Sequence, residues 1–161
     1  MHQVTFAEAE YNLKRRKTRR EKFLSQMNAL IPWRRLEARI APCYPRSKRG
    51  REPYPLKVML RVHCMQLFYN LSDPAMQDAL YEIESMRNFA GLTLNGPIPD
   101  ETTILNFRHL LESNQLGTTL FEEINKYLAE NGMVLREGTI VDATIISAPS
   151  SSKNKKKDRD P

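Results

Sequence analysis

A single carboxylate, Asp142, lies inside the most strand-like segment of the chain, TIVDATII. On a strand its side chain shares a face with Ile140 and Thr144, because side chains alternate between the two faces. A carboxylate on a mainly apolar face loses hydration unless a hydrogen-bond donor or a cation meets it. A divalent ion such as Mg²⁺, which binds a few carboxylates together with water and phosphate oxygens, is one such partner. The residue types alone favour a hydrogen-bonded structural Asp142 over a metal ligand.

A dense run of cations, KRRKTRREK at residues 14–22, is the second candidate for chemistry. Seven of its nine residues are Lys or Arg, so it cannot be a buried element. Because like charges repel, the free segment should be extended or weakly helical, and a phosphate backbone could order it while counterions are released. The alternative is a solvated tail with no partner. The cations that we expect to contact DNA here are Lys14, Arg15, Arg16, Lys17, Arg19 and Arg20.

A second cationic stretch, PCYPRSKRGREPYP at residues 42–55, is rich in proline and carries two tyrosines, Tyr44 and Tyr54. Basic residues that alternate with aromatic ones are typical of nucleic-acid surfaces. An exposed linker between helices is the alternative interpretation. The expected DNA contacts of this loop, and of the preceding segment WRRLEARIAP, are Arg46, Lys48, Arg49, Arg51, Arg34 and Arg35.

One pair of predicted helices, beginning at Asp73 and Asp100, could form a helix-turn-helix reader. The N-terminal part of such a second helix usually faces base edges, which makes Thr103, Asn106 and Arg108 candidates for DNA contacts. However, the linker exceeds the usual short turn, and acidic residues surround the pair. The basic segments are therefore the better candidates for the main contacts.

The elements that must position these residues are mainly helical. Apolar residues recur at helical spacing in segments near 23–31, 33–41, 55–70, 73–91, 101–114 and 116–132. The period then changes, and two short strands near 133–136 and 139–146 fit a β-hairpin. We expect a basic arm over residues 1–22, a helical DNA-binding and assembly domain over 23–132, strands over 133–148 and a disordered basic tail over 149–161.

Charge and composition narrow the class of protein. The net charge is +6, and residues 1–53 carry 14 Lys or Arg against 5 Asp or Glu, which indicates a polyanionic partner. No apolar run is long enough for a membrane span, so we expect a cytoplasmic protein associated with the nucleoid. The two cysteines and three histidines show no zinc-site spacing, and we expect His63 and Cys64 to be packing residues.

Three segments together resemble a known family: REPYPLKVMLRVHCMQLFYNLSDPAMQDALYEI, PDETTILNFRHLLE and GTIVDATIISAPSSSKNKKKDRDP. In this order they are similar to the N-terminal part of DDE transposases of the insertion sequence 5 type, over nearly the whole chain. The resemblance implies a helical DNA-binding domain that leads into a ribonuclease-H-like catalytic domain of α/β type. It also implies that Asp142 is the first acid of a catalytic triad that binds Mg²⁺ or Mn²⁺.

The family's remaining acids would lie beyond residue 161, so we expect residues 1–161 to bind the terminal inverted repeats without cutting them. Such a chain is either a fragment or a truncated product, and it could form homo-oligomers or join full-length transposase. A truncated regulator that blocks transposition and a helical protein-interaction domain are the alternatives. A phosphotransferase with an Asp nucleophile is disfavoured, because Thr144 stands where such enzymes have a second Asp.

Overall fold

The computed structural model describes residues 6–14, 16–47 and 49–133. Within them the chain forms eight α-helices and no strand, which confirms the mainly helical prediction. By its internal contacts the chain divides into two compact units, residues 1–127 and residues 128–161. The predicted hairpin lies outside the described residues except for Met133, and Asp142 lies outside them altogether. None of the described helices has the length and apolarity needed to cross a bilayer.

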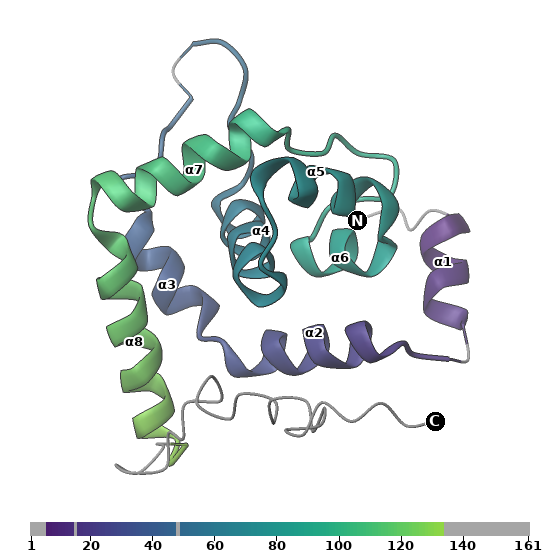
Figure 1. The fold of residues 1–161 in the computed structure, drawn as a ribbon, viewed down its shortest axis with the longest axis horizontal. Coiled ribbons are helices and arrows are strands. Elements are labelled where there is room, and N and C mark those ends of the chain that lie inside the picture. The colour runs from purple at the N-terminus through teal and green to yellow at the C-terminus, as the bar shows by residue number, and fades with distance from the viewer. Residues whose placement is uncertain (1–5, 15, 48, 134–161) are drawn as a thin grey trace, which may run out of the picture. The chain divides into compact units, whose positions relative to one another are not determined.

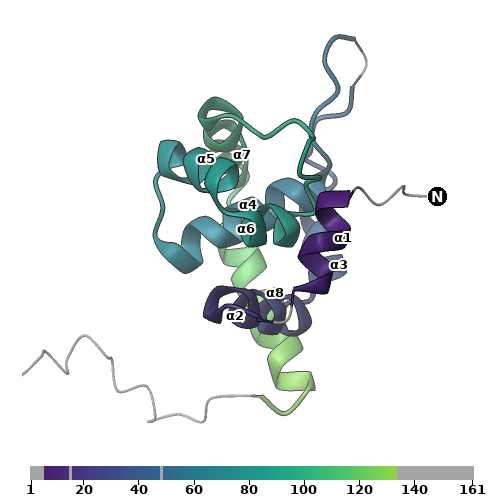
Figure 2. The ribbon, with the colours of Figure 1, turned by 90° about the vertical axis from the view of Figure 1, so that its right-hand side faces the viewer.

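The helices follow one another with short connections. Their bounds are α1 Phe6–Leu13, α2 Arg19–Leu30, α3 Trp33–Ile40, α4 Leu56–Tyr69, α5 Asp73–Glu82, α6 Glu84–Ala90, α7 Glu101–Ser113 and α8 Leu116–Glu130. In both views of the ribbon α4 lies between α7 on one side and α2 on the other (Figures 1 and 2). The loop between α3 and α4 projects away from the helices in both views.

The central position of α4 follows from its sequence. Val58, Met59, Leu60, Val62 and Met65 are all buried, so the helix is apolar around most of its circumference. It packs against α3, α5, α6 and α7, and together these helices enclose one hydrophobic core. Leu67 of the same helix is 68% exposed.

Two features raise the number of helices above the five or six that we expected. The first is α1, which lies in the stretch 1–22 that we expected to form a basic arm. The second is a break at Ile83, whose extended backbone (φ −112°, ψ 102°) divides the predicted helix 73–91 into α5 and α6. Several helix ends match the prediction, since Asp100 caps α7 and Gly91 ends α6 at a φ of +79°. The cap of α5 is Ser72 rather than Asp73.

Candidate nucleic-acid interface

The basic segment, residues 14–22, runs from the end of α1 into the first turn of α2. Helix α2 begins at Arg19, earlier than predicted, because Thr18 and Glu21 form a capping box. The Glu21 backbone amide donates to Thr18 Oγ1 at 3.2 Å, and the Thr18 amide donates to Glu21 Oε2 at 2.6 Å. These bonds stabilise the first turn of α2 against the repulsion among its cations.

Glu21 also ties α1 to α2. The Tyr11 hydroxyl donates to Glu21 Oε1, and Lys14 forms an ion pair with the same oxygen. Burial alone would raise the pKa of Glu21, but hydrogen bonds from Lys14, Tyr11 and the Thr18 backbone lower it to about 2. Burial and the neighbouring carboxylate raise the pKa of Tyr11. Glu21 is therefore an anion at neutral pH, and Lys14 is partly neutralised.

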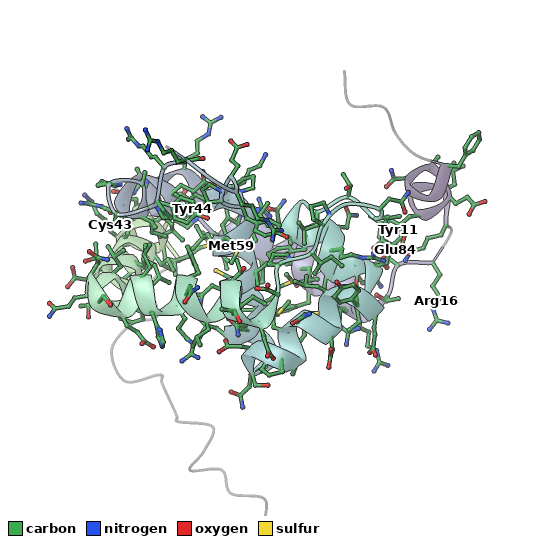
Figure 3. The ribbon with its side chains drawn as sticks, turned by 90° about the horizontal axis from the view of Figure 1, so that it is seen from above. Tyr11, Arg16, Cys43, Tyr44, Met59 and Glu84 are labelled. Carbon is green, nitrogen blue, oxygen red and sulfur yellow. The ribbon has the colours of Figure 1, made fainter. Side chains whose placement is uncertain are left out.

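The other described cations of the basic segment are exposed. Arg16, Lys17 and Arg19 have no ion-pair partner among the described residues, and Figure 3 shows Arg16 pointing away from the helices. Arg20 lies over the Tyr69 ring, 5.6 Å from its centroid, and is still solvent-exposed. Arg15 lies outside the described residues. Exposed cations spaced along one segment, as these three are, can contact successive phosphates of a nucleic-acid backbone.

The basic loop, residues 42–55, is anchored at its two ends. The Tyr44 hydroxyl donates to the backbone oxygen of Tyr54 at 2.6 Å, which closes the loop at its base. The Arg51 guanidinium lies 5.7 Å from the Tyr54 ring centroid. Arg46, Arg49 and Arg51 are exposed, and Lys48 lies outside the described residues. The exposed cations therefore lie in a loop whose two ends are joined by a hydrogen bond, and not in an unconstrained linker.

The first turns of α7 lie beside this loop. Thr103 and Asn106, which were predicted to face DNA, line a cavity of about 310 Å³ together with Arg51 and Tyr54 of the loop. Thr103 is also part of the helix cap, since its backbone amide donates to Asp100 Oδ1 at 2.7 Å. The structure thus brings one predicted loop cation, Arg51, together with the polar start of α7.

The basic segment and the basic loop form separate surfaces. Arg16 and Tyr44 lie at opposite ends of the view in Figure 3, with the helices between them. A nucleic acid that touched both would have to extend along the helices that separate them.

Several arginines of the helices are engaged with carboxylates instead. Arg108 Nη2 lies 2.6 Å from Asp73 Oδ2, which joins α7 to α5. Burial alone would raise the pKa of Asp73, but hydrogen bonds from Gln66 and Arg108 lower it. Arg108, one of the predicted DNA contacts, therefore has a structural partner within the helices.

A second carboxylate, Glu123 of α8, holds two arginines of α3. Arg39 Nη2 lies 2.9 Å and Arg35 Nη1 lies 3.6 Å from its oxygens, and the Glu123 side chain is only 9% exposed. Arg35 also lies over the Tyr127 ring, 5.3 Å from its centroid. The remaining predicted cation of α3, Arg34, is exposed. The three arginines of α3 thus divide between a buried anion and the solvent.

The predicted helix-turn-helix pair is not joined by a short turn. Helix α6 and an extended loop separate α5 from α7, although the two helices pack against each other. The backbone amide of Glu101 donates to Gln77 Oε1 at 2.8 Å across this contact. Gln77 therefore helps to fix the N-terminal end of α7 against α5.

One arginine that the sequence did not single out is central to the packing. Arg61 of α4 lies over the Trp33 ring, 4.2 Å from its centroid, and donates to Asn28 Oδ1 at 2.7 Å and to the Phe89 backbone oxygen at 3.1 Å. It links α2, α3 and α6 to α4. The available signal was a single Lys or Arg inside the apolar run 58–69.

The described residues contain no group of three or more His, Cys, Asp or Glu that could hold a metal ion. His63 stacks edge-on against Phe107, and burial lowers its pKa. Burial raises the pKa of the Cys64 thiol to about 12, so it is protonated at neutral pH. Both residues pack in the interior, as the sequence predicted.

Comparison with solved structures finds none that matches this chain. A family model described as transposase domain (DUF772) matches residues 11–110. The matched range begins at the Tyr11 contact with Glu21 and extends through the basic segment, the basic loop and most of α7. Since the match covers more than half of the sequence, the chain belongs to the transposase domain (DUF772) family.

Proposed function

We propose that the helical region binds the DNA ends of a transposable element through the basic segment and the basic loop. The observation that carries the proposal is the exposure of the cations in these two segments of a transposase-family chain. Arg16, Lys17 and Arg19 of the segment, and Arg46 and Arg49 of the loop, all face solvent. Phosphate contacts by such residues supply affinity and fix the orientation of a protein on the duplex.

The division of the arginines into those with protein partners and those exposed to solvent supports this proposal. Arg39, Arg61 and Arg108 have protein partners that hold helices together. The exposed cations are most concentrated in the basic segment and the basic loop. Figure 3 places Arg16 of the segment and Tyr44 of the loop far apart. An arrangement of this kind suits a ligand that carries many negative charges along an extended path, as duplex DNA does.

The finer assignment rests on the sequence resemblance. We propose that the chain is of the insertion sequence 5 type, that the segment after α8 begins a ribonuclease-H-like domain, and that Asp142 is its first catalytic acid. Mg²⁺ or Mn²⁺, held by Asp142 and by further acids outside residues 1–161, would act as a Lewis acid at the phosphodiester. The described residues offer no cluster to hold such an ion, so no catalytic step is assigned to them.

The DNA-binding proposal is tested by titrating a fluorescently labelled 30-base-pair duplex with the chain at several salt concentrations. We expect log Kd to rise linearly with log[salt], with a slope of about 0.9 for each phosphate contacted. Selection from a random-sequence duplex library, followed by titration of the selected sequence and its scrambled version, then measures sequence preference. Weak binding that does not depend on salt would overturn the proposal.

A matched pair of charge reversals locates the contact. Arg16→Glu changes an exposed cation of the basic segment, and Lys126→Glu makes the same kind of change at an exposed position of α8. We expect R16E to weaken binding and to reduce the salt slope, and K126E to have a smaller effect on both. Equal effects would show that net charge alone, rather than the basic segment, determines binding.

A further inference from the structure

The cavity between the basic loop and α7 has a chemical character of its own. It has a volume of about 310 Å³, at the low end of the range for small-ligand pockets. Its lining residues are Tyr44, Pro45, Arg51, Glu52, Pro53, Tyr54, Met59, Thr103, Asn106, Phe107 and Leu110. The space is therefore large enough for one small group, and its lining combines aromatic and apolar side chains with a few polar ones.

The floor of this cavity is apolar and belongs to the core. Met59 is 2% exposed and Phe107 is 5% exposed, so both are fixed by the packing of α4 and α7. The Tyr44 ring meets Phe107 edge-on with centroids 6.1 Å apart, and the Tyr44 hydroxyl holds the backbone of Tyr54. These contacts hold Tyr44 and Tyr54 beside the buried side chains of Met59 and Phe107. Tyr44 and Met59 are labelled in Figure 3.

The polar groups lie on the α7 side and at the mouth. Asn106 has no hydrogen-bond partner among the described residues, so its amide is available both to donate and to accept. Glu52 adds a carboxylate that can accept from an exocyclic amine. Arg51 lies over the Tyr54 ring, and Arg46 and Arg49 extend from the same loop. The cavity is thus a largely aromatic space, lined by one guanidinium and one carboxylate, beside exposed cations.

We propose that this cavity receives a single unstacked nucleobase of the bound DNA. Tyr54 would offer a ring for stacking, Asn106 would hydrogen-bond the edge of the base, and Arg51 would contact the adjoining phosphate. Aromatic stacking, an amide aimed at a base edge and nearby cations together are how proteins hold an extrahelical base. The inference rests on the proposed DNA-binding function and adds to it a subsite for an unpaired base.

The surroundings favour a nucleobase over an apolar peptide side chain as the occupant. Arg46 and Arg49 project from the loop that borders the cavity, which suits a polyanion rather than an uncharged partner. Asn106 would lose hydration without compensation if it were covered by an apolar group. A base attached to a phosphate backbone satisfies both the amide and the cations.

The test compares three labelled duplexes of one sequence: fully paired, with a one-nucleotide bulge, and with the same bulge lacking its base. The base-free bulge has a similar backbone break, so it controls for easier bending. We expect the chain to bind the bulge that carries a base about tenfold tighter than the base-free bulge, because stacking one base on an aromatic ring contributes an affinity of this order.

Substitutions of residues that line the cavity test whether they cause the preference for the bulge that carries a base. Tyr54→Leu removes the ring but leaves the backbone oxygen that Tyr44 holds, and Asn106→Leu removes the amide from an exposed helix position. We expect Y54L to abolish most of the tenfold ratio and N106L to reduce it about threefold. The matched control is Asn125→Leu, which changes an exposed Asn of α8 and should keep the ratio.

The outcomes separate the two proposals. If the chain binds none of the duplexes, both the proposed function and the nucleobase subsite are overturned. Equal affinity for the two bulges, with salt-dependent binding to all three duplexes, overturns the subsite alone. The subsite is also overturned if Y54L and N106L keep the same affinity ratio between the two bulges as N125L does.

Discussion

The basic loop and the helical core both contain arginines, but these arginines have opposite surroundings. In the core, Arg61 is enclosed by two aromatic rings and donates to two oxygens, one from a side chain and one from the backbone. In the loop, Arg46 and Arg49 are exposed to solvent. The residue type is the same, so partners decide whether a cation stabilises the fold or remains available to a ligand.

The basic segment combines both situations within a few residues. Lys14 is paired with Glu21, whereas Arg16 and Lys17 face solvent. The pairing fixes α1 on α2 and so positions the exposed cations that follow. In this cationic run, one residue therefore stabilises the fold through an ion pair, while others remain exposed and available to a ligand.

The largest expected effect is on stability and concerns Arg61. Arg61→Ala removes the contacts with Trp33 and Phe89 and the hydrogen bond to Asn28, so we expect the free energy of unfolding to fall by about 2–4 kcal/mol. Arg49→Ala should change it by less than about 0.5 kcal/mol, since Arg49 is exposed. Urea denaturation followed by circular dichroism measures both. Similar losses in the two variants would erase the distinction between core and loop arginines.

A smaller effect is expected at Glu123, which holds Arg35 and Arg39 on α3. Glu123→Gln preserves the volume but weakens both contacts, so we expect a loss of about 1–2 kcal/mol in unfolding free energy. It should also raise DNA affinity a few-fold at low salt, because Arg39 loses its anionic partner.

The neighbouring exposed residue supplies the control for this change. Glu122→Gln removes the same charge one position earlier. If E122Q raises affinity as much as E123Q, net charge explains the gain and release of Arg39 does not. Denaturation and anisotropy titration on the two variants give the comparison.

The smallest effect is the pH dependence that Glu21 contributes. Its pKa is lowered from 4.5 to about 2 in the folded chain, so its stabilising contribution is complete above 4.5 and is lost as the pH falls toward 2. We expect the unfolding free energy of the native chain to fall more steeply over this window than that of Glu21→Gln. The other carboxylates are common to both, and parallel curves would show that the Glu21 contacts are not maintained in solution.

Much of the fold could be predicted from local signals. Apolar periodicity located most of the helices, and Asp100 and Gly91 marked helix ends. The break at Ile83 could not be read, because nothing in EIES breaks a helix by itself and the bend depends on the packing of α5 and α6 against α4. Helix α1 was missed because its hold on α2 comes from Tyr11 and Glu21, ten residues apart.

The candidate site was predictable in part. Exposed basic loops are recognisable from charge density and proline content, and Arg46, Arg49 and Arg51 lie in such a loop. Sequence could not show that Arg108 is paired with Asp73, since the two are 35 residues apart. It also could not show that Asn106 and Tyr54 line one cavity, because that depends on how α7 packs beside the loop.

The most direct test of DNA binding uses a variant that lacks exposed cations in both the basic segment and the basic loop. The quantity measured is the slope of log Kd against log[salt]. In Arg16→Gln/Arg19→Gln/Arg46→Gln/Arg49→Gln, each lost phosphate contact should reduce the slope of log Kd against log[salt] by about 0.9, so the account predicts a reduction of roughly 3–4. The thermal midpoint should stay near that of the native chain, because none of the four residues has an ion-pair partner among the described residues. An unchanged slope in a variant that is still folded would contradict the account.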